Sequence, residues 1–480
     1  MELLTLLATA SCLLLAAVAL RRSTMRARAR RTLHRVRDAA VAHRALNQNA
    51  DAFLDRAEGF FPVVLGTGLL RGERNETIVT ASHGPHWRAL RCNLSADVLH
   101  PSRVASLAPL QQEAAQTLLA DLFAKVQGEA ASLVIRGDLN RAAFSLLARM
   151  CFGDGVDGHC VEAMEREMLD LLATVGELIP VMDGSWLPQL LYRRQLTHLT
   201  GALGRQKLLY LPLIDARRQP ESRVYNGGGV AYPYVDSLLD LRVPNGEGGG
   251  RRALRDDELV CLVSEFLGSG SGSTVACVEW TLAHLIDIPE VQEKLRREID
   301  GTDGGRASIK SLRRGMPYLN AVVLESLRMH PAAPFMMRGT HGDGAAVVGA
   351  TTVPNDDDGL MVQFVLGDIG RDIKVWKDPD EFRPERFLAG GEAEGVGPLP
   401  GPKEVRMLPF GIGHRHCPGT SFAMLQVKCF LAALVRELEW ADDSATASNG
   451  GVDMTELDVF FKVMKKPLSA RVKRRAVKYS

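Results

Sequence analysis

The chain has 480 residues, of which 46% are hydrophobic and 24% are charged, a composition typical of a globular protein with a substantial core. The 58 Lys and Arg residues balance 57 Asp and Glu residues, so the formal net charge of +1 provides no global field that would favour nucleic acid as a partner. The 8 cysteines form no C-x-x-C pair and no dense framework, which argues against both a disulfide scaffold and a structural zinc site.

An uncharged run at residues 3–20 is close to the roughly 20 residues that a helix needs to cross a bilayer. Arginines crowd residues 21–37, and this positive-inside bias predicts that the rest of the chain lies in the cytosol. A cleaved signal peptide is the alternative, because Ala17-Val18-Ala19 is typical of a cleavage site, but the charged n-region is missing. We therefore expect a single-pass anchor over residues 1–22 and a catalytic domain over residues 32–480.

The remaining pattern is mainly helical. Apolar residues at helical spacing predict helices over residues 104–125, 139–152, 161–178, 196–216, 256–288 and 316–329. Glycine-rich stretches predict loops at residues 219–250 and 389–403. Short β-like stretches predict a minor sheet from residues 345–353 and 360–365. The fold class is therefore predicted to be mainly α with a small β-region, preceded by a transmembrane helix.

The strongest chemical signal is the run F-G-I-G-H-R-H-C-P-G at residues 410–419, which is followed by an apolar helix over residues 421–438. A thiolate at Cys417 would lie near a helix N-terminus, where the dipole and free amide groups lower its pKa and stabilise its charge, as an iron ligand requires. An isolated Cys-Pro-Gly would favour a buried free cysteine beside a turn. The complete pattern disfavours that alternative, because five positions fit together: Phe410, Gly413, Arg415, Cys417 and Gly419.

This run resembles the haem-binding loop of the cytochrome P-450 superfamily, F-x-x-G-x-R-x-C-x-G, and other motifs of that family occur in the expected order. Glu325-x-x-Arg328 resembles its E-x-x-R helix, and Arg386 stands in the run F-R-P-E-R-F at residues 382–387. The resemblance implies that these three residues form a buried structural network. Spacing alone supports only the pairing of Glu325 with Arg328, which an exposed helix ion pair would also explain.

The resemblance also implies which residues hold the cofactor, haem b. Trp87-x-x-x-Arg91 resembles the family's W-x-x-x-R helix, whose Trp and Arg reach a haem propionate. Arg415 resembles a second propionate ligand, and Arg338 is a third candidate. Cys417 is the expected axial ligand of the iron.

Three further runs resemble the plant microsomal branch of the family, and most of all its family 89: residues 144–153, 209–218 and 234–241. This resemblance implies a triangular, mainly helical fold at the endoplasmic reticulum membrane. It also implies a partner, NADPH-cytochrome P-450 reductase, and a reaction that inserts one atom of O₂ into a small, apolar substrate.

Two departures from the family pattern bear on activity. The proline-rich hinge, first helix and first β-region strands that normally follow the anchor are expected to be missing, because residues 21–31 lead almost directly into residues 43–53. In the central helix, Gly272 stands in place of an acid and Ser273 in place of the oxygen-handling threonine. Since O–O cleavage needs protons, the relay is expected to be weakened and to depend on Ser273 or Thr274 with water.

The leading hypothesis is a monooxygenase supplied with electrons by the reductase. A haem-thiolate isomerase or dehydratase that activates no O₂ is an alternative, because it would tolerate the altered relay. A third possibility is a truncated, degenerate family member without catalytic activity, which would be compatible with both departures.

Overall fold

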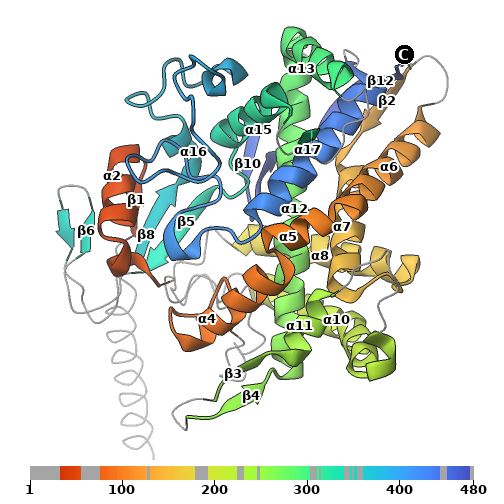
Figure 1. Cartoon of the computed structure of the whole chain (residues 1–480), viewed down its shortest axis with the longest axis vertical. Helices are drawn as coiled ribbons and strands as arrows, with labels where there is room; N and C mark the ends of the chain where they lie inside the picture. The colour runs from red at the N-terminus through yellow and green to blue at the C-terminus, as the bar shows by residue number, and fades with distance from the viewer. Residues whose placement is uncertain are drawn as a thin grey trace, which may run out of the picture.

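The computed structural model describes most of the chain, in the following ranges: residues 33–55, 76–126, 130–178, 193–223, 232–245, 249–302, 311–312, 315–339, 346–348, 351–353, 361–443 and 451–475. Helices fill the centre and one side of the molecule, and a small β-region lies at the other side, on the left in Figure 1. The predicted fold class of the body, mainly α with a small β-region, is confirmed. The predicted anchor at residues 1–22 lies outside the described residues.

Long helices pack around a central one, α12 (Asp256–Asp287), which runs through the middle of the molecule (Figure 1). Its helical neighbours include α7 (Arg136–Phe152), α8 (Gly158–Leu178), α10 (Arg193–Arg218), α15 (Pro317–Met329) and α17 (Thr420–Glu437). Among the described residues, α12 alone is long and apolar enough to cross a membrane, and 72% of its most apolar window is buried inside the protein. That burial is what a core helix shows.

The other helices are shorter or peripheral. They are α2 (Ala39–His43), α4 (Pro85–Cys92), α5 (Pro101–Ser106), α6 (Ala108–Lys125), α11 (Tyr234–Asp240), α13 (Pro289–Gly301) and α16 (Leu366–Gly370). Short 3₁₀ or π turns occur at Arg44–Gln48, Ala50–Phe53, Asn93–Val98, Pro220–Arg223, Pro384–Phe387 and Gly413–Arg415.

In the described part of the chain, the strands form two three-stranded sheets and three hairpins. One sheet has the order β1-β8-β5 and consists of β1 (Leu33–Val36), β8 (Met361–Val365) and β5 (Phe335–Gly339). In it β1 runs parallel and β5 antiparallel to β8. The antiparallel second sheet has the order β2-β12-β9 and consists of β2 (Ala131–Val134), β12 (Ser469–Arg474) and β9 (Leu438–Asp442). The hairpins are β3 (Arg242–Pro244) with β4 (Arg251–Ala253), β6 (Ala346–Val348) with β7 (Thr351–Val353), and β10 (Glu456–Asp458) with β11 (Lys462–Met464).

The long helices lie close to their predicted bounds, but two expectations need correction. The predicted loop at residues 219–250 contains the helix α11, whose Tyr234 and Val235 are buried against the helical core. The first β-region strands were expected to be missing, yet Leu33–Val36 forms β1 and pairs with β8. This four-residue segment has little strand-forming pattern of its own, and it becomes a strand because it pairs with the edge of β8.

A buried ionic network joins α15 to the segment that precedes the cysteine loop. Arg328 donates to both carboxylate oxygens of Glu325, at 2.7 and 2.8 Å, and Arg386 Nε donates to Oε1 at 3.2 Å. The remaining N–H groups of Arg328 include donors to the carbonyls of Gly370 and Pro379. The structure therefore brings together the three residues expected from the E-x-x-R and F-R-P-E-R-F motifs, and all three are buried.

A second buried cluster holds the hairpin β10–β11. The Glu456 carboxylate accepts hydrogen bonds from Lys462 Nζ at 2.5 Å and Arg371 Nη2 at 2.9 Å, and it lies 2.8 Å from His330 Nδ1. His330 Nε2 lies 2.9 Å from His284 Nε2, and the His330 ring stacks on Trp280 at 3.9 Å between centroids. The cluster thus ties the hairpin to both α12 and the end of α15.

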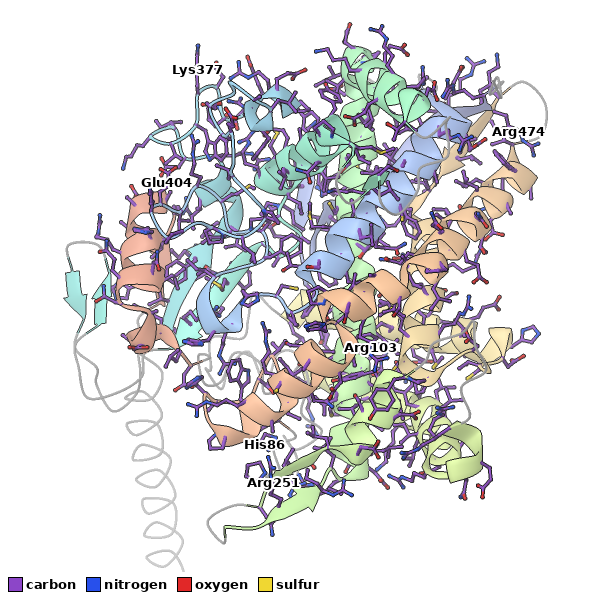
Figure 2. All side chains as sticks on the ribbon, viewed as in Figure 1. His86, Arg103, Arg251, Lys377, Glu404 and Arg474 are labelled. Carbon is purple, nitrogen blue, oxygen red and sulfur yellow. The ribbon has the colours of Figure 1, made fainter. Side chains whose placement is uncertain are left out.

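Charged side chains on the outside contrast with these buried ones. In Figure 2 Arg251, Lys377, Glu404 and Arg474 extend from the periphery away from the helical core, and all four are exposed. Solvated charges of both signs fit the near-zero net charge of the chain.

We predict that Glu325→Gln destabilises the folded protein by about 3–5 kcal/mol, because it leaves two buried guanidinium groups without their shared charge. Denaturant-induced unfolding followed by circular dichroism measures the change. The matched control is Asp380→Asn, since that side chain is 89% exposed and lies 3.7 Å from Arg371. An equal effect of the two substitutions would contradict the structural importance of the network.

We also predict that acidification destabilises the fold through the His330 cluster. Burial lowers the pKa of His330 to about 4, although the hydrogen bond with Glu456 raises it, and burial together with the charge of His330 lowers the pKa of His284. Burial alone would raise the pKa of Glu456, but hydrogen bonds with His330 and Lys462 outweigh it and hold that pKa below its usual range.

The direction in which stability changes with pH follows from proton uptake. Between the unfolded pKa of 6.5 and the folded value of about 4 for His330, the unfolded chain binds more protons, so stability falls as pH falls. The midpoint of thermal unfolding should therefore decrease across this window, and His330→Asn, which keeps a donor but cannot titrate, should reduce the decrease. The exposed His159→Asn serves as the control, and an unchanged slope in His330→Asn would refute the assignment.

Candidate functional site

A cavity of about 360 Å³ lies between α12 and the loop that carries Cys417. Most of its lining is apolar, contributed by α4, α12, β5 and the segment after the loop, and includes Leu94, Phe266 and Val427. Cys417 lies at one wall, and Ser273 and Thr274 of α12 also line the cavity. The cavity is therefore a mainly apolar chamber with a sulfur atom and a few polar groups, as a site for an apolar ligand requires.

The cysteine loop lies at the boundary between two hydrophobic cores. Leu408 belongs to the core of the β-region, whereas Phe410 packs against the helical core. Gly411 and Gly413 have φ angles of +72° and +68°, a left-handed conformation that L side chains rarely adopt. The Cys417 amide donates to the Phe410 carbonyl at 2.8 Å, which closes the loop. The glycine and phenylalanine positions of the motif thus have a direct geometric reason.

The environment of Cys417 has opposing effects on the ionisation of its thiol. Burial raises the pKa of its thiol, whereas the backbone N–H of Gly419, the charge of Arg91 and the hydroxyl of Thr420 lower it. α17 begins at Thr420, so the sulfur lies close to a helix N-terminus. A buried thiol with these partners becomes a stable thiolate when a cation binds to it.

Arg415 spans the space between the loop and the chain before α4. Its Nε donates to the Leu54 carbonyl at 2.6 Å and its Nη2 to the Ala81 carbonyl at 2.7 Å. The third nitrogen, Nη1, is buried and has no hydrogen-bond partner in the described part of the chain. Burial lowers the pKa of Arg415 to about 10, against the charge of Asp55, which raises it. A buried donor without an acceptor is what a missing carboxylate ligand would leave behind.

Trp87 supports Arg415 through its ring. The guanidinium carbon lies 4.8 Å from the centroid of the indole, at cation–π distance. The indole N–H donates to the Ile78 carbonyl at 3.1 Å. The geometry gives Trp87 the part of a platform for Arg415.

Arg91 and Arg338 both line the cavity. Burial lowers the pKa of Arg91, whereas the nearby Cys417 raises it. Arg338 is only 2% exposed and donates from Nη1 to the Met337 carbonyl at 3.2 Å. The structure therefore gathers the three arginines expected at the propionates around one chamber, where an anionic ligand would offset their burial.

The hydroxyl groups of α12 bond to their own helix. Ser271, Ser273 and Thr274 each donate to the carbonyl four residues earlier, at 2.7, 2.7 and 2.8 Å. Ser273 and Thr274 line the cavity, as expected for the two relay candidates. At Gly272, however, the room for a side chain is taken, because an added Cβ would lie 2.7 Å from Cδ2 of Phe461. The absence of an acidic side chain at residue 272 therefore coincides with a lack of room for one.

One polar residue at the cavity was not expected from sequence. Glu265 lies two helical turns before Ser273, and Glu265, Ser269 and Ser273 are spaced four apart and line the same chamber. The carboxylate accepts from the Val79 amide at 2.9 Å. The four-residue spacing of Glu265 and Ser269 from Ser273 is the sequence signal that places this acid on the same face of α12.

Comparisons with known proteins agree with this geometry. Residues 27–464 match the family model described as Cytochrome P-450. The chain is 33% identical over 448 residues to cytochrome P-450 89A9 of Arabidopsis thaliana, which covers 91% of this chain and 83% of the relative. It is 30% identical over 382 residues to a flavonoid 3'-monooxygenase of Crocosmia x crocosmiiflora, covering 76% of this chain and 70% of the relative.

Solved structures share the fold. A zebrafish cytochrome P-450 structure with progesterone superposes with a TM-score of 0.72 at 21% identity, covering 92% of this chain and 93% of the other. The abiraterone structure of a zebrafish cytochrome P-450 gives a TM-score of 0.70 over the same shares.

Proposed function

Because the chain belongs to the cytochrome P-450 family and is thus a haem b-dependent monooxygenase, we propose that Cys417 is the thiolate ligand of its haem iron. The observation that carries this assignment is the combination of a half-buried cysteine in a glycine-bent loop with a buried, unpartnered arginine donor at the same cavity. Two of the described cysteines line that cavity, Cys277 in α12 and Cys417 in the loop, and only Cys417 stands in the glycine-bounded motif.

The residues around the cavity fit haem b in charge. Arg415 would donate its orphaned Nη1 to one propionate, and Arg91 and Arg338 would hold the carboxylates from the other sides. Trp87 would keep the Arg415 guanidinium in place. Phe410, Gly413 and Gly419 would shape the loop so that backbone N–H groups face the sulfur.

The haem supplies the iron at which O₂ is activated and from which one oxygen atom is transferred to the substrate. The protein's contribution is to exclude water, orient the substrate and move protons. The apolar lining of the chamber would bind a small apolar molecule and keep it away from bulk solvent.

For proton movement we propose Ser273 and Thr274, because both residues line the cavity. Their hydroxyls donate to helix carbonyls, which leaves oxygen lone pairs that accept from water on the cavity side. Glu265 and Ser269 extend the same polar face by two turns towards the Val79 backbone. In this scheme the glutamate replaces the acid missing at residue 272 as a proton source, through intervening water.

We further propose that residues 1–22 anchor the protein in the endoplasmic reticulum membrane and that the catalytic domain, residues 32–480, faces the cytosol. There it would accept electrons from NADPH-cytochrome P-450 reductase. The support is the length of the uncharged run and the arginines that follow it.

Reduced, carbon-monoxide-treated protein should show the thiolate-type absorption band, and Cys417→Ala should lose it. The control is Cys429→Ala, because Cys429 is buried in α17 and does not line the cavity. Loss of the band in Cys429→Ala with its retention in Cys417→Ala would reverse the assignment of the ligand.

Protease added to intact microsomes should digest the catalytic domain, because that domain is exposed to the cytosol. A variant in which Leu6, Leu13 and Leu14 are replaced by Asp should be released into the soluble fraction, since charges at the centre of a span oppose insertion by about 3 kcal/mol each. Protection of the domain from protease, or a mature N-terminus near Leu20, would contradict the proposed anchor.

A further inference from the structure

Two histidine rings contact each other where the cysteine loop meets the chain before α4. The ring centroids of His83 and His414 lie 6.0 Å apart, with 49° between the ring planes. His414 is exposed and His83 is half-buried, so solvent reaches the pair. Neither residue lines the cavity beside Cys417. In the described part of the chain neither ring forms a hydrogen bond, so the ring nitrogens are available to a ligand.

Arg415 and Asp55 hold the backbone on both sides of this pair. Nη2 of Arg415 donates to the Ala81 carbonyl at 2.7 Å, and the His83 amide donates to Oδ1 of Asp55 at 2.5 Å. His414 directly precedes Arg415 in the cysteine loop. The two histidines therefore belong to segments that are already joined, which lowers the entropic cost of binding one ligand between them.

The spacing of the two rings fits a single bridging metal ion. A ring nitrogen binds a divalent ion such as Zn²⁺ at about 2.0–2.1 Å, which puts the ring centroid about 3.2 Å from the ion. Two such centroids are at most about 6.4 Å apart, and about 5.2 Å apart at a tetrahedral angle. The observed 6.0 Å lies between these values, so a small rotation of the exposed His414 side chain would complete the bridge.

The surroundings of His83 favour its neutral form. Burial, followed by the charges of Arg88 and Arg415, lowers the pKa of this histidine, whereas the charge of Asp55 raises it. The Trp87 ring, 5.2 Å away between centroids, limits the movement of the imidazole. Neutral imidazole is the form that binds transition metals. Because the two arginines also repel cations, the site selects an ion with a strong preference for nitrogen.

The coordination by protein would be partial. No group of three or more His, Cys, Asp or Glu residues among those described is arranged to hold a metal ion. Two imidazoles would therefore supply two ligands, and water would fill the other positions. Such a site binds its ion reversibly, unlike a closed structural zinc site with four protein ligands.

We propose that His83 and His414 form a binding site for a divalent transition-metal ion, with Cu²⁺ bound more tightly than Zn²⁺. This order follows from the affinity of imidazole sites for first-row ions. The inference goes beyond the proposed function and does not depend on it, because the pair lies outside the cavity. The bound ion adds a link between the cysteine loop and the chain before α4, so it stabilises the fold around Arg415.

Calorimetric titration of the full-length protein with Cu²⁺ and with Zn²⁺ tests the site. All proteins carry Cys92→Ser, because an exposed thiol also binds these ions. His83→Gln and His414→Gln should each weaken the tightest site by about tenfold or more, since even changes behind the ligands typically cost roughly 10–100-fold. The double variant should resemble either single variant, because one substitution already breaks the bridge.

Two histidine variants serve as controls and should bind like the unaltered protein. His416→Gln is the matched control, because His416 stands in the same loop but lines the cavity, and its Nδ1 lies 2.8 Å from the Gly413 carbonyl. His159→Gln in α8 is the remote control, because that residue is exposed. Equal affinity in all the variants would mean binding to scattered histidines only and would overturn the site.

Arg88→Gln gives a test in the opposite direction. It removes an exposed cation that acts on His83, so it should tighten Cu²⁺ by about twofold at low salt and less at about 1 M salt. Unchanged or weaker binding in Arg88→Gln would contradict an ion at His83.

Thermal unfolding gives an independent readout. Zn²⁺ should raise the midpoint of the unaltered protein and not that of His414→Gln, and Mg²⁺, which prefers oxygen ligands, should leave both unchanged. An equal rise with Zn²⁺ in both proteins would refute the bridge. If His83→Gln does not fold, the exposed His414→Gln decides the question alone.

Discussion

The carboxylate of Glu325 is the charge on which the position of the cysteine loop depends. Arg328, which it binds, lies with its guanidinium carbon 5.0 Å from the ring centroid of Trp376, and Arg406 lies 4.5 Å from the same centroid. Trp376 also donates to the Arg406 carbonyl at 3.1 Å. A continuous series of contacts therefore leads from α15 to a residue just before Phe410. Because a buried charge tolerates little misplacement of its partners, the network fixes the start of the loop relative to α15.

Sequence reasoning recovered the parts of the molecule that have a local signal. The long helices have apolar residues at a helical period, and the glycines of the cysteine loop mark backbone conformations that only glycine adopts easily. The strands were recovered poorly, because most are three to six residues long and depend on a partner distant in the chain, as β1 depends on β8. Helix α11 was missed for the same reason: its flanking glycines indicated a loop, and burial of Tyr234 outweighs that local preference.

The features of the candidate site divide in the same way, into those with a local sequence signal and those that depend on contacts between distant segments. Cys417, Arg415 and the pairing of Glu325 with Arg328 could be predicted because each stands in a motif or at a helical spacing. The direction of the Trp87 N–H towards Ile78, the unpartnered Nη1 of Arg415 and the presence of Glu265 at the cavity depend on contacts between distant segments. These contacts decide how charge is distributed around the sulfur. Arg415 is buried and the nearby Arg91 is half-buried, so an anionic cofactor and a thiolate would each relieve the repulsion between these two cations.

The middle of α12 shows how a change of one side chain can redistribute roles. At residue 272 the absence of a side chain removes an acid from the helix and, at the same time, admits Phe461 to the cavity wall. The hydroxyls of Ser271, Ser273 and Thr274 remain bonded within the helix, which satisfies them but gives them no fixed donor from a neighbouring side chain. In the proposed relay, protons would come along the face that carries Ser269 and Glu265, two turns away, and not across the helix from residue 272. Near residue 272, α12 therefore borders an apolar wall and offers no short polar route for protons. The proposed chemistry next to Cys417 then depends on whether water can occupy the longer polar face.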